Sequence, residues 1–217
     1  MKNWKMLTLL TPAQILSSAY DWEQSVDDGK TWASYKSKTS MSGCLYRFKE
    51  KDGVEPSIYY PYESVDEIFG FFGPYRFLSN FHICENEFRV YDRIWNTSEH
   101  AYMWAKTFPD HNQGTYETVA AMTPREVKKW GSQVELRKDW DHVRVAVMEE
   151  AIFQKFKNNP DLVKLLLSTG TKTLLEANWW NDRFWGVCHK TRRGKSVLGD
   201  ILMEVRNHFR MEELFGC

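Results

Sequence analysis

The sequence lacks the features that mark several classes of protein. Its four cysteines, Cys44, Cys84, Cys188 and Cys217, are scattered, with no CxxC pair and no histidine at ligand spacing. Neither a zinc site nor a disulfide framework is therefore indicated. No apolar run approaches the ~20 residues needed to cross a bilayer. Thr, Pro and Gln soon interrupt the short apolar run at the start, so we expect no signal peptide. These absences predict a cytoplasmic protein without a metal, a cofactor or a membrane partner.

An excess of charge of either sign is also missing. Twenty-nine basic residues balance twenty-nine acidic ones, so no global field would draw the protein to DNA or to an anionic membrane. Any contact with nucleic acid would have to be local. Aromatic residues, by contrast, are plentiful, because they make up 15% of the 217 residues and include ten Trp. Such rings either pack in the core or line a cleft where they stack on a base or a sugar, and composition leaves both alternatives open.

The length of the chain and the change in sequence composition along it suggest one domain with an appended segment. We interpret residues 1–62 as an N-terminal extension, in which a Thr-Pro-Ala-Gln sequence favours a helix that reaches Trp22. Alternating residues predict two short strands over 44–48 and 57–62, around an Asp-Gly turn. Residues 63–217 carry the candidate chemistry, and we expect them to form the catalytic domain.

The periodicity of the remaining residues predicts more helix than strand. N-cap residues, a proline at the first helical position and apolar spacing of 3.6 residues indicate helices, and short apolar runs indicate strands. The expected helices cover 99–106, 124–130, 139–157, a short segment from 160 and 197–209, and the expected strands cover 68–72, 88–95, 174–176 and 184–187. The predicted fold class is α+β, predominantly α, with a few short β-strands.

Two charged residues of the predicted helix 99–106 are the first candidates for catalysis. Glu99 and Lys106 are seven residues apart, or about two turns, so their side chains extend from nearly the same face. The backbone N–H groups of a helix start stabilise a carboxylate there, which suits a general base. Lys106 is suited to holding phosphate or, when desolvated, to acting as a nucleophilic amine. The alternative is a solvated helical surface that carries unrelated charges.

Two further segments combine polar, aromatic and basic residues. Residues 178–186 alternate side chains that could bind sugar hydroxyls with rings that could stack on a base, and Gly186 admits close backbone approach. Such a segment is also typical of an aromatic loop that caps a core, with Asp182 as a turn residue. Basic residues surround Gly194 ahead of the last predicted helix. This arrangement could bind phosphate, but it is not specific to phosphate sites and does not have the residue spacing of a P-loop.

Several motifs occur together and in order along the chain. They are Leu78-Ser79-Asn80-Phe81, Trp95-Asn96-Thr97-Ser98-Glu99-His100, Ala105-Lys106, Leu136-Arg137-Lys138-Asp139-Trp140, Leu175-Glu176-Ala177-Asn178, Asp182 with Trp185-Gly186, and Gly194-Lys195 followed by Leu198-Gly199 and Leu202-Met203-Glu204-Val205-Arg206. In this combination the sequence resembles the NADAR, or YbiA-like, family over roughly residues 68–210. The first 60 residues lie outside the resemblance.

The resemblance implies a YbiA-like helical domain and an N-glycosidase activity. Members of the family cleave a C1′–N bond, either in ribosylamino intermediates of riboflavin synthesis or between ADP-ribose and the guanine amino group of nucleic acid. By position, Glu99 matches the essential carboxylate and Lys106 the helix lysine of the family, and we therefore expect both to be catalytic. The expected substrate-binding residues are Asn80, Phe81, Trp95, Tyr102, Trp130, Asp182, Trp185, Gly186 and Lys195.

The resemblance is incomplete at two positions. Many relatives carry Gln four residues after the Glu and Asn after Gly-Lys, whereas this chain has Met103 and Ser196. The absence of these two amide side chains affects the expected substrate specificity more than the expected type of bond that is cleaved. Our leading hypothesis is hydrolysis of an ADP-ribosylated guanine, in DNA, RNA or a nucleotide, or of a related ADP-ribose conjugate. The alternatives are an N-glycosidase of phosphorylated ribosylamino-pyrimidines of riboflavin biosynthesis and a non-catalytic ADP-ribose-binding module. The sequence does not predict an oligomeric state.

Overall fold

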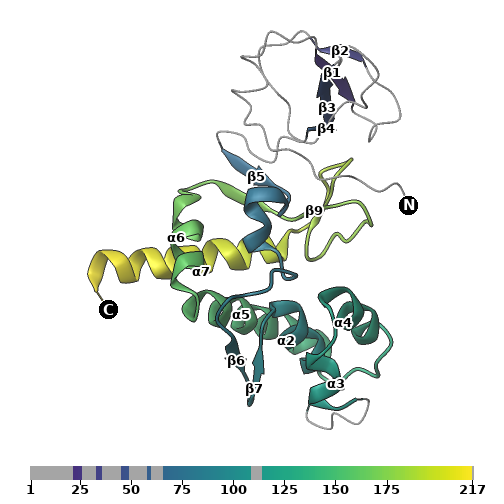
Figure 1. Cartoon of the computed structure of the whole chain (residues 1–217), viewed down its shortest axis with the longest axis vertical. Coiled ribbons are helices and arrows are strands. Elements are labelled where there is room, and N and C mark those ends of the chain that lie inside the picture. The colour runs from purple at the N-terminus through teal and green to yellow at the C-terminus, as the bar shows by residue number, and fades with distance from the viewer. Residues whose placement is uncertain are drawn as a thin grey trace. The chain divides into compact units, whose positions relative to one another are not determined.

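The computed structural model describes residues 66–108 and 114–216 and, before them, the backbone of four short strands. The chain forms two compact units (Figure 1). The first unit comprises Met1–Arg76 and Thr171–Gly199, and the second comprises Phe77–Gly170 and Asp200–Cys217. The expected separation of an extension, residues 1–62, from a catalytic domain stays a prediction.

The four N-terminal strands form an antiparallel sheet in the order β2-β1-β3-β4. They are β1 (Trp22–Ser25), β2 (Ala33–Tyr35), β3 (Leu45–Phe48) and β4 (Ile58–Tyr59). The two predicted strands are confirmed as β3 and β4, which pair with each other. The predicted helix is wrong at Trp22, because the backbone there pairs in extended form with Tyr35 and Phe48. The rest of that helix and the Asp-Gly turn lie outside the described residues.

Two parallel strand pairs belong to the remainder of the first unit. They are β5 (Glu67–Phe69) with β8 (Thr173–Leu175), and β9 (Ala177–Asn178) with β10 (Val187–Cys188). Phe69, Ala177 and Val187 form a buried core around these strands. β8 confirms the strand predicted near 174–176, whereas the strand predicted over 68–72 is confirmed only at 68 and 69, because β5 ends at Phe69 and Gly70 has a φ of 102°.

The strand predicted over 184–187 is wrong for its first three residues. Oδ1 of Asp182 accepts hydrogen bonds from the N–H groups of Phe184 and Trp185, at 3.0 Å each. A side chain that bonds to its own backbone in this way folds the chain into a turn. The apolar run therefore begins its strand pairing only at Val187.

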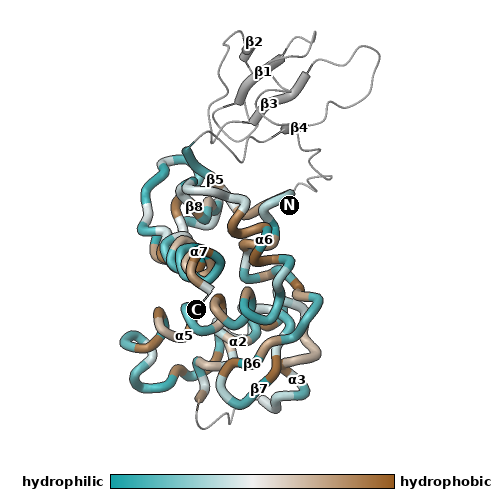
Figure 2. Tube along the Cα trace, turned by 90° about the vertical axis from the view of Figure 1, so that its left-hand side faces the viewer, coloured by the Kyte–Doolittle hydropathy of each residue, from teal (hydrophilic) through white to brown (hydrophobic). Residues whose placement is uncertain are grey.

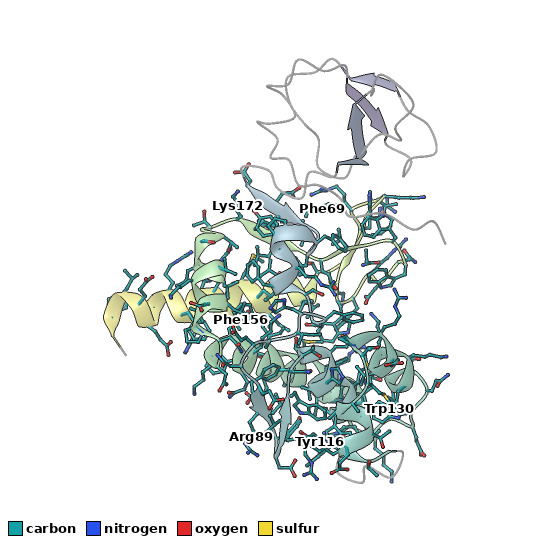
Figure 3. The ribbon with its side chains drawn as sticks, viewed as in Figure 1. Phe69, Arg89, Tyr116, Trp130, Phe156 and Lys172 are labelled. Atoms are coloured by element: carbon teal, nitrogen blue, oxygen red, sulfur yellow. The ribbon has the colours of Figure 1, made fainter. Side chains whose placement is uncertain are left out.

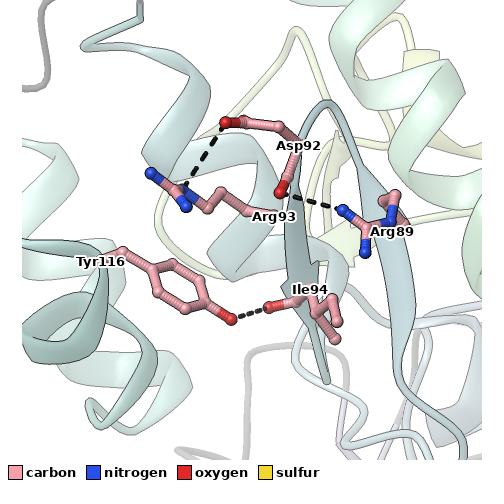
Figure 4. A network of polar contacts seen from close by, with 5 residues as sticks. All are labelled: Arg89, Asp92, Arg93, Ile94 and Tyr116. Atoms are coloured by element: carbon pink, nitrogen blue, oxygen red, sulfur yellow. Dashed lines mark hydrogen bonds and ion pairs between the residues drawn. The ribbon is translucent and has the colours of Figure 1, made fainter.

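The strand predicted over 88–95 is a hairpin. Its strands are β6 (Phe88–Val90) and β7 (Arg93–Trp95). Tyr91, the first of the two turn residues, has a φ of 55°. The carbonyl of Asp92 accepts a hydrogen bond from Arg89 at 3.0 Å, and the Asp92 carboxylate lies 3.9 Å from Nε of Arg93 (Figure 4). The sequence pattern did not indicate this turn because it contains neither Gly nor Asn, the usual residues at positive φ.

Helices dominate the described part of the second unit, which confirms the predicted α+β, predominantly α, fold class. They are α2 (Ser98–Ala105), α3 (Tyr116–Ala120), α4 (Pro124–Gly131), α5 (Trp140–Lys157), α6 (Pro160–Ser168) and α7 (Val197–Phe215), whose first turn belongs to the first unit; a short 3-10 helix, η1 (Gly73–Leu78), comes before them. All the predicted helices of this region are confirmed. Only α3 was not predicted, because five residues carry too little periodicity. Apolar and polar stretches alternate along α6 and α7 (Figure 2), as expected for helices with one buried face.

Lys155, on α5, is fully buried in the second unit. Its ammonium donates hydrogen bonds to the carbonyl oxygens of Phe77 at 2.6 Å and Ser79 at 3.0 Å, and lies 5.3 Å from the ring centre of Phe156. Burying a charge costs free energy unless polar partners compensate, and the two carbonyls supply that compensation. As a result, α5 fixes the backbone that leads into Asn80.

We expect the substitution Lys155→Met to lower the free energy of unfolding by about 2 kcal/mol or more, because two carbonyls lose the donor that they share. The matched control is Lys157→Met, which changes an exposed lysine of the same helix. Urea unfolding followed by circular dichroism measures both variants. Equal unfolding free energies for Lys155→Met and the wild type would contradict this role.

Candidate active site

The candidate catalytic residues lie at the two ends of α2, a helix whose eight residues, Ser98–Ala105, are all buried. Thr97 is its N-cap, and its hydroxyl oxygen accepts the N–H of His100 at 3.2 Å. The imidazole of His100 completes the cap, since Nδ1 lies 2.6 Å from that hydroxyl and Nε2 lies 2.9 Å from the carbonyl oxygen of Met122. A carbonyl can only accept, so Nε2 carries a proton; burial lowers the pKa of His100, and in the neutral ring Nδ1 accepts from the Thr97 hydroxyl. The start of α2 is therefore held by a neutral histidine.

Glu99 lies in the first turn of α2 and is only 3% exposed. Its backbone N–H donates to the carbonyl oxygen of Asn80 at 3.1 Å. The side-chain oxygen of Asn80 accepts a hydrogen bond from the hydroxyl of Ser98 at 3.3 Å. These bonds join two motifs that are distant in the sequence, and the burial excludes a solvated helical surface at Glu99.

Lys106 follows the last residue of α2 and is partly buried. Its ammonium donates to the carbonyl oxygen of Gly131 at 2.7 Å. It also lies 5.8 Å from the ring centre of Tyr102 and 6.0 Å from that of Trp140, and these two rings are 5.0 Å apart. Lys106 is therefore oriented by one carbonyl and two aromatic faces.

The environment of Lys106 changes its proton affinity. Burial lowers the pKa of Lys106 below its ordinary value, while the nearby Glu99 carboxylate raises it and the Lys128 ammonium lowers it. Burial is the largest of the three effects, so the net direction is downward. A lysine with a lowered pKa has more neutral amine near neutral pH and is a better nucleophile.

Trp95 and Trp130 belong to one cluster of rings. The ring centre of Trp95 lies 5.9 Å from that of Trp104 and 5.2 Å from that of Tyr116, and Trp104 stacks on Trp130 at 6.3 Å; Figure 3 labels Trp130 and Tyr116. Trp95 is 2% exposed, as is typical of a core residue, whereas Trp130 is partly exposed. Their contact with a substrate stays a prediction.

Both positions at which the chain departs from the family pattern are occupied by buried side chains. Met103 packs where α2 meets α4, so closely that a β-carbon on Gly131 would lie 2.3 Å from its sulfur. The hydroxyl of Ser196 accepts the N–H of Glu176 at 3.1 Å, and Ser196 has a φ of 51°. Met103 thus fills a helix contact, and Ser196 completes a backbone connection in the first unit.

The second group of candidates lies in the first unit, on the loop between β9 and β10 and, for Lys195, after β10. Asn178 is 1% exposed, and its amide nitrogen donates to the carbonyl oxygens of Asp182 at 2.7 Å and Val187 at 3.1 Å. Its amide oxygen accepts the N–H of Asp182 at 2.9 Å. Asn178 therefore closes the loop, and one oxygen of the Asp182 carboxylate is engaged in the turn that follows.

Gly186 and Trp185 on this loop and Lys195, which comes after β10, differ in their exposure. Gly186 is buried against the backbone, because a β-carbon there would lie 2.3 Å from the carbonyl oxygen of Glu176. Only glycine permits so close an approach. Trp185 is partly buried and meets Phe184 edge-on at 5.0 Å, whereas Lys195 is exposed, with its ammonium 5.6 Å from the ring centre of Phe184.

The predicted site residues fall into two groups. The second unit holds Glu99, Lys106, Asn80, Phe81, Trp95, Tyr102 and Trp130, and the first unit holds Asp182, Trp185, Gly186 and Lys195. The Phe81 ring centre lies 5.4 Å from the ammonium of Lys128, whose charge also lowers the pKa of Lys106. That the two groups share one cavity stays a prediction.

Two residues that build the site were not predicted. His100 directly follows Glu99, and its role as part of the cap depends on Met122, which is distant in sequence. Lys155 did carry a signal, because it continues the spacing of Val147 and Ala151 by a further four residues. That spacing places the lysine on the buried stripe of α5.

A groove of about 410 Å³ between α5 and α7 contains none of the predicted site residues. It is lined by Ala146, Glu149, Glu150, Phe153, Glu204, Val205 and His208. Its three carboxylates would repel a phosphorylated substrate. The groove is therefore a poor candidate for the active site.

Within residues 66–108 and 114–216, no three His, Cys, Asp or Glu side chains gather as ligands of a metal ion would. Over the same part of the chain, no helix has the length and apolar character needed to span a membrane.

Comparison with known proteins gives a consistent family match. The sequence model of the NADAR domain matches residues 69–210. An N-glycosidase of Nostoc punctiforme is 36% identical over 140 residues, which cover 63% of this chain and 87% of that protein. The N-glycosidase YbiA of Escherichia coli K12 is 34% identical over 131 residues, which cover 58% of this chain and 77% of that protein.

A solved structure is similar to the same part of the chain. The NMR structure of YbiA from Escherichia coli has a TM-score of 0.59 and 30% sequence identity, and the match covers 71% of this chain and 91% of that chain. The YbiA-like character of the fold, which the motifs implied, is therefore confirmed.

The neutral ring of His100 makes stability depend on pH. Burial lowers the pKa of His100 below 6.5, and the bond to the Met122 carbonyl offsets this only in part. The unfolded chain then binds a proton at pH values where the folded ring is still neutral. The stabilisation is complete above pH 6.5 and is lost as the pH falls below that value towards the folded pKa.

We expect the urea midpoint to fall as the pH is lowered through this range, and to fall less steeply in His100→Gln, because the amide does not titrate. Equilibrium unfolding at a series of pH values measures both slopes. Identical slopes in the two proteins would show that His100 does not carry the effect.

Proposed function

The chain belongs to the NADAR domain family, and we propose that it hydrolyses the C1′–N bond of an ADP-ribosylated guanine in nucleic acid or in a nucleotide. It is a hydrolase of N-glycosyl bonds, the activity that relatives 34% and 36% identical to it carry in their names. The proposal rests chiefly on one observation, which is a buried carboxylate, Glu99, that interacts with a lysine of lowered pKa, Lys106, at the other end of α2.

Glu99 is proposed as the general base. Hydrolysis adds water across the C1′–N bond, so that C1′ gains the hydroxyl and the departing nitrogen gains the proton. The N–H groups at the start of a helix favour the ionised carboxylate. Burial strengthens the attraction between that carboxylate and the positive charge that develops on the sugar. Glu99 takes a proton from the attacking water or, alternatively, assists the opening of the sugar ring.

Lys106 has two alternative roles in this scheme. Its lowered pKa supports a nucleophilic amine that traps the opened sugar as a Schiff base, which water then hydrolyses. Its hydrogen bond to the Gly131 carbonyl and the two nearby rings equally support a fixed cation that stabilises negative charge on the substrate. In either role, Lys106 needs its position at the end of α2.

The remaining candidates are proposed to bind the substrate. The Asn80 amide already bonds to Ser98, and its nitrogen lies 3.4 Å from the sulfur of Met148, so one amide hydrogen is left for a ribose hydroxyl. Asp182 is proposed to bind ribose with the carboxylate oxygen that is not in its turn. Lys195 is exposed, as a phosphate-binding residue should be. The residues proposed to line the substrate-binding site beside the ribose or the base are Phe81, Trp95, Tyr102, Trp130, Trp185 and Gly186.

A second candidate substrate is a phosphorylated ribosylamino-pyrimidine. It is favoured by a riboflavin biosynthesis protein of Vibrio vulnificus, which is 34% identical over 140 residues that cover 62% of this chain and 35% of that protein. A third candidate is an ADP-ribose-binding module without turnover. The presence of both Glu99 and Lys106 argues against the third candidate, because binding alone needs neither a general base nor an amine of lowered pKa.

We expect Glu99→Gln to lower kcat by at least about 100-fold and to leave the fold intact, because the amide keeps the shape and removes the base. The matched control is Glu149→Gln, which makes the same change at an exposed position on α5. Release of ADP-ribose, followed by chromatography, measures turnover, and circular dichroism measures folding. Wild-type turnover by Glu99→Gln would refute the proposed mechanism.

Two parallel incubations distinguish the candidate substrates. The protein is mixed with guanine-ADP-ribosylated DNA and, separately, with the ribosylamino-pyrimidine phosphate. We expect release of ADP-ribose from the first and much slower release of ribose 5-phosphate from the second. The reverse preference would assign the second candidate substrate, and tight ADP-ribose binding without turnover of either compound would assign the binding module.

A further inference from the structure

The loop that follows β9 (Figure 1) carries two adjacent tryptophans that are exposed to solvent. Trp179 is 42% exposed and Trp180 is 59% exposed. The ring of Trp179 lies 4.8 Å from that of His189 and 5.1 Å from that of Phe72, centre to centre. These contacts hold Trp179 in one orientation while part of its surface stays accessible. Large exposed aromatic residues next to each other are typical of a surface that binds a ligand or another macromolecule.

Basic side chains concentrate on the same segment. Between residues 178 and 195 the chain has five basic residues, Arg183, Lys190, Arg192, Arg193 and Lys195, and one acidic residue, Asp182. All five basic residues are exposed. Arg192 forms an ion pair with Glu67 at 2.5 Å. The other four contribute to a local positive charge in a protein whose formal net charge is zero.

The segment is held in one conformation by its own backbone. The N–H of Lys195 donates to the carbonyl of Arg183 at 2.8 Å, and the N–H of Cys188 donates to the carbonyl of Arg193 at 2.9 Å. Asn178 closes the first part of the segment through three hydrogen bonds of its amide. A surface that is ordered before binding loses less conformational entropy when a ligand binds.

We propose that Trp179, Trp180, Arg183, Lys190 and Arg193 form a surface that binds single-stranded nucleic acid. Exposed indole rings stack on unpaired bases of any sequence, and basic side chains beside them follow the phosphates. Stacking requires a base that is not paired, so the surface selects single strands over duplexes. The inference deepens the proposed function, on which it rests, by making the modified guanine of a polynucleotide the preferred substrate over a free nucleotide.

Binding to unmodified oligonucleotides tests the surface without any turnover. Fluorescence anisotropy of labelled oligo-dT and oligo-U with the full chain gives the Kd at several salt concentrations. We expect Trp180→Ala to weaken binding about ten-fold, because one stacked base is lost. We expect the double substitution Lys190→Ser and Arg193→Ser to reduce the slope of log Kd against log salt by about 1.4. DNA and RNA share the recognised chemistry, so binding of either supports the proposal.

The matched controls lie in the second unit. Phe215→Ala removes a ring that is 65% exposed, and Lys138→Ser with Lys157→Ser removes two exposed charges. Both controls should bind oligonucleotides as the wild type does. Circular dichroism establishes that each variant is folded, and Trp180→Phe, which keeps a ring, should retain binding if Trp180→Ala is unstable.

Turnover then separates this inference from the proposed function. Trp180→Ala should lower kcat/KM about ten-fold on an ADP-ribosylated oligonucleotide and leave it unchanged on ADP-ribosylated guanosine. Oligonucleotide binding that persists while no N-riboside is hydrolysed would refute the proposed function and leave the surface supported. Three results would contradict the proposed binding surface. They are hydrolysis of guanosine conjugates without any oligonucleotide binding, control variants that weaken binding as much as the surface variants do, and tighter binding to a duplex than to a single strand.

Discussion

The burial of a carboxylate in the first turn of α2 is the constraint on which the rest of the second unit depends. An ionised group taken out of water costs several kcal/mol unless the protein compensates. The compensation found around Glu99 is local, because the dipole of α2 favours a negative charge in its first turn and the lysine at the other end of α2 supplies an opposite charge. The neighbouring segments keep this helix start in place. The Asn80 carbonyl holds the Glu99 N–H, and the buried ammonium of Lys155 holds the backbone ahead of Asn80.

Much of the fold follows from local signals in the sequence. The start of α4 is an example, because the predicted capping box forms there. The N–H of Glu126 donates to the Thr123 hydroxyl at 3.3 Å, and the N–H of Thr123 donates to the Glu126 carboxylate at 2.8 Å. The incorrect strand predictions also have local causes. The turn at Tyr91 lacks the residues that usually mark positive φ, and the turn at Asp182 depends on a side chain that bonds to the backbone within an apolar run.

The candidate site was predictable in part. Seven-residue spacing on one helix was enough to propose Glu99 and Lys106 as a pair, and the Glu99 carboxylate is close enough to raise the pKa of Lys106. Spacing could not indicate their burial, because burial arises from segments far away in the sequence, such as Gly131 of α4 and Trp140 of α5. For the same reason the roles of His100 and Lys155 emerge only from tertiary contacts.

The departures at Met103 and Ser196 bear on specificity. Both side chains are engaged in packing or in a backbone hydrogen bond, so neither position offers the amide that many relatives carry. Substrate selection must then depend on other groups. We infer that the exposed tryptophans and basic residues after β9 contribute to that selection.

The central claim is that the carboxylate of Glu99 and the amine of Lys106 face the carbon at which the glycosidic bond breaks. A crystal structure of the protein with bound ADP-ribose tests this most directly. The account predicts C1′ of the terminal ribose in van der Waals contact with both side chains. An ADP-ribose whose C1′ lies away from α2, for example in the groove between α5 and α7, would contradict it.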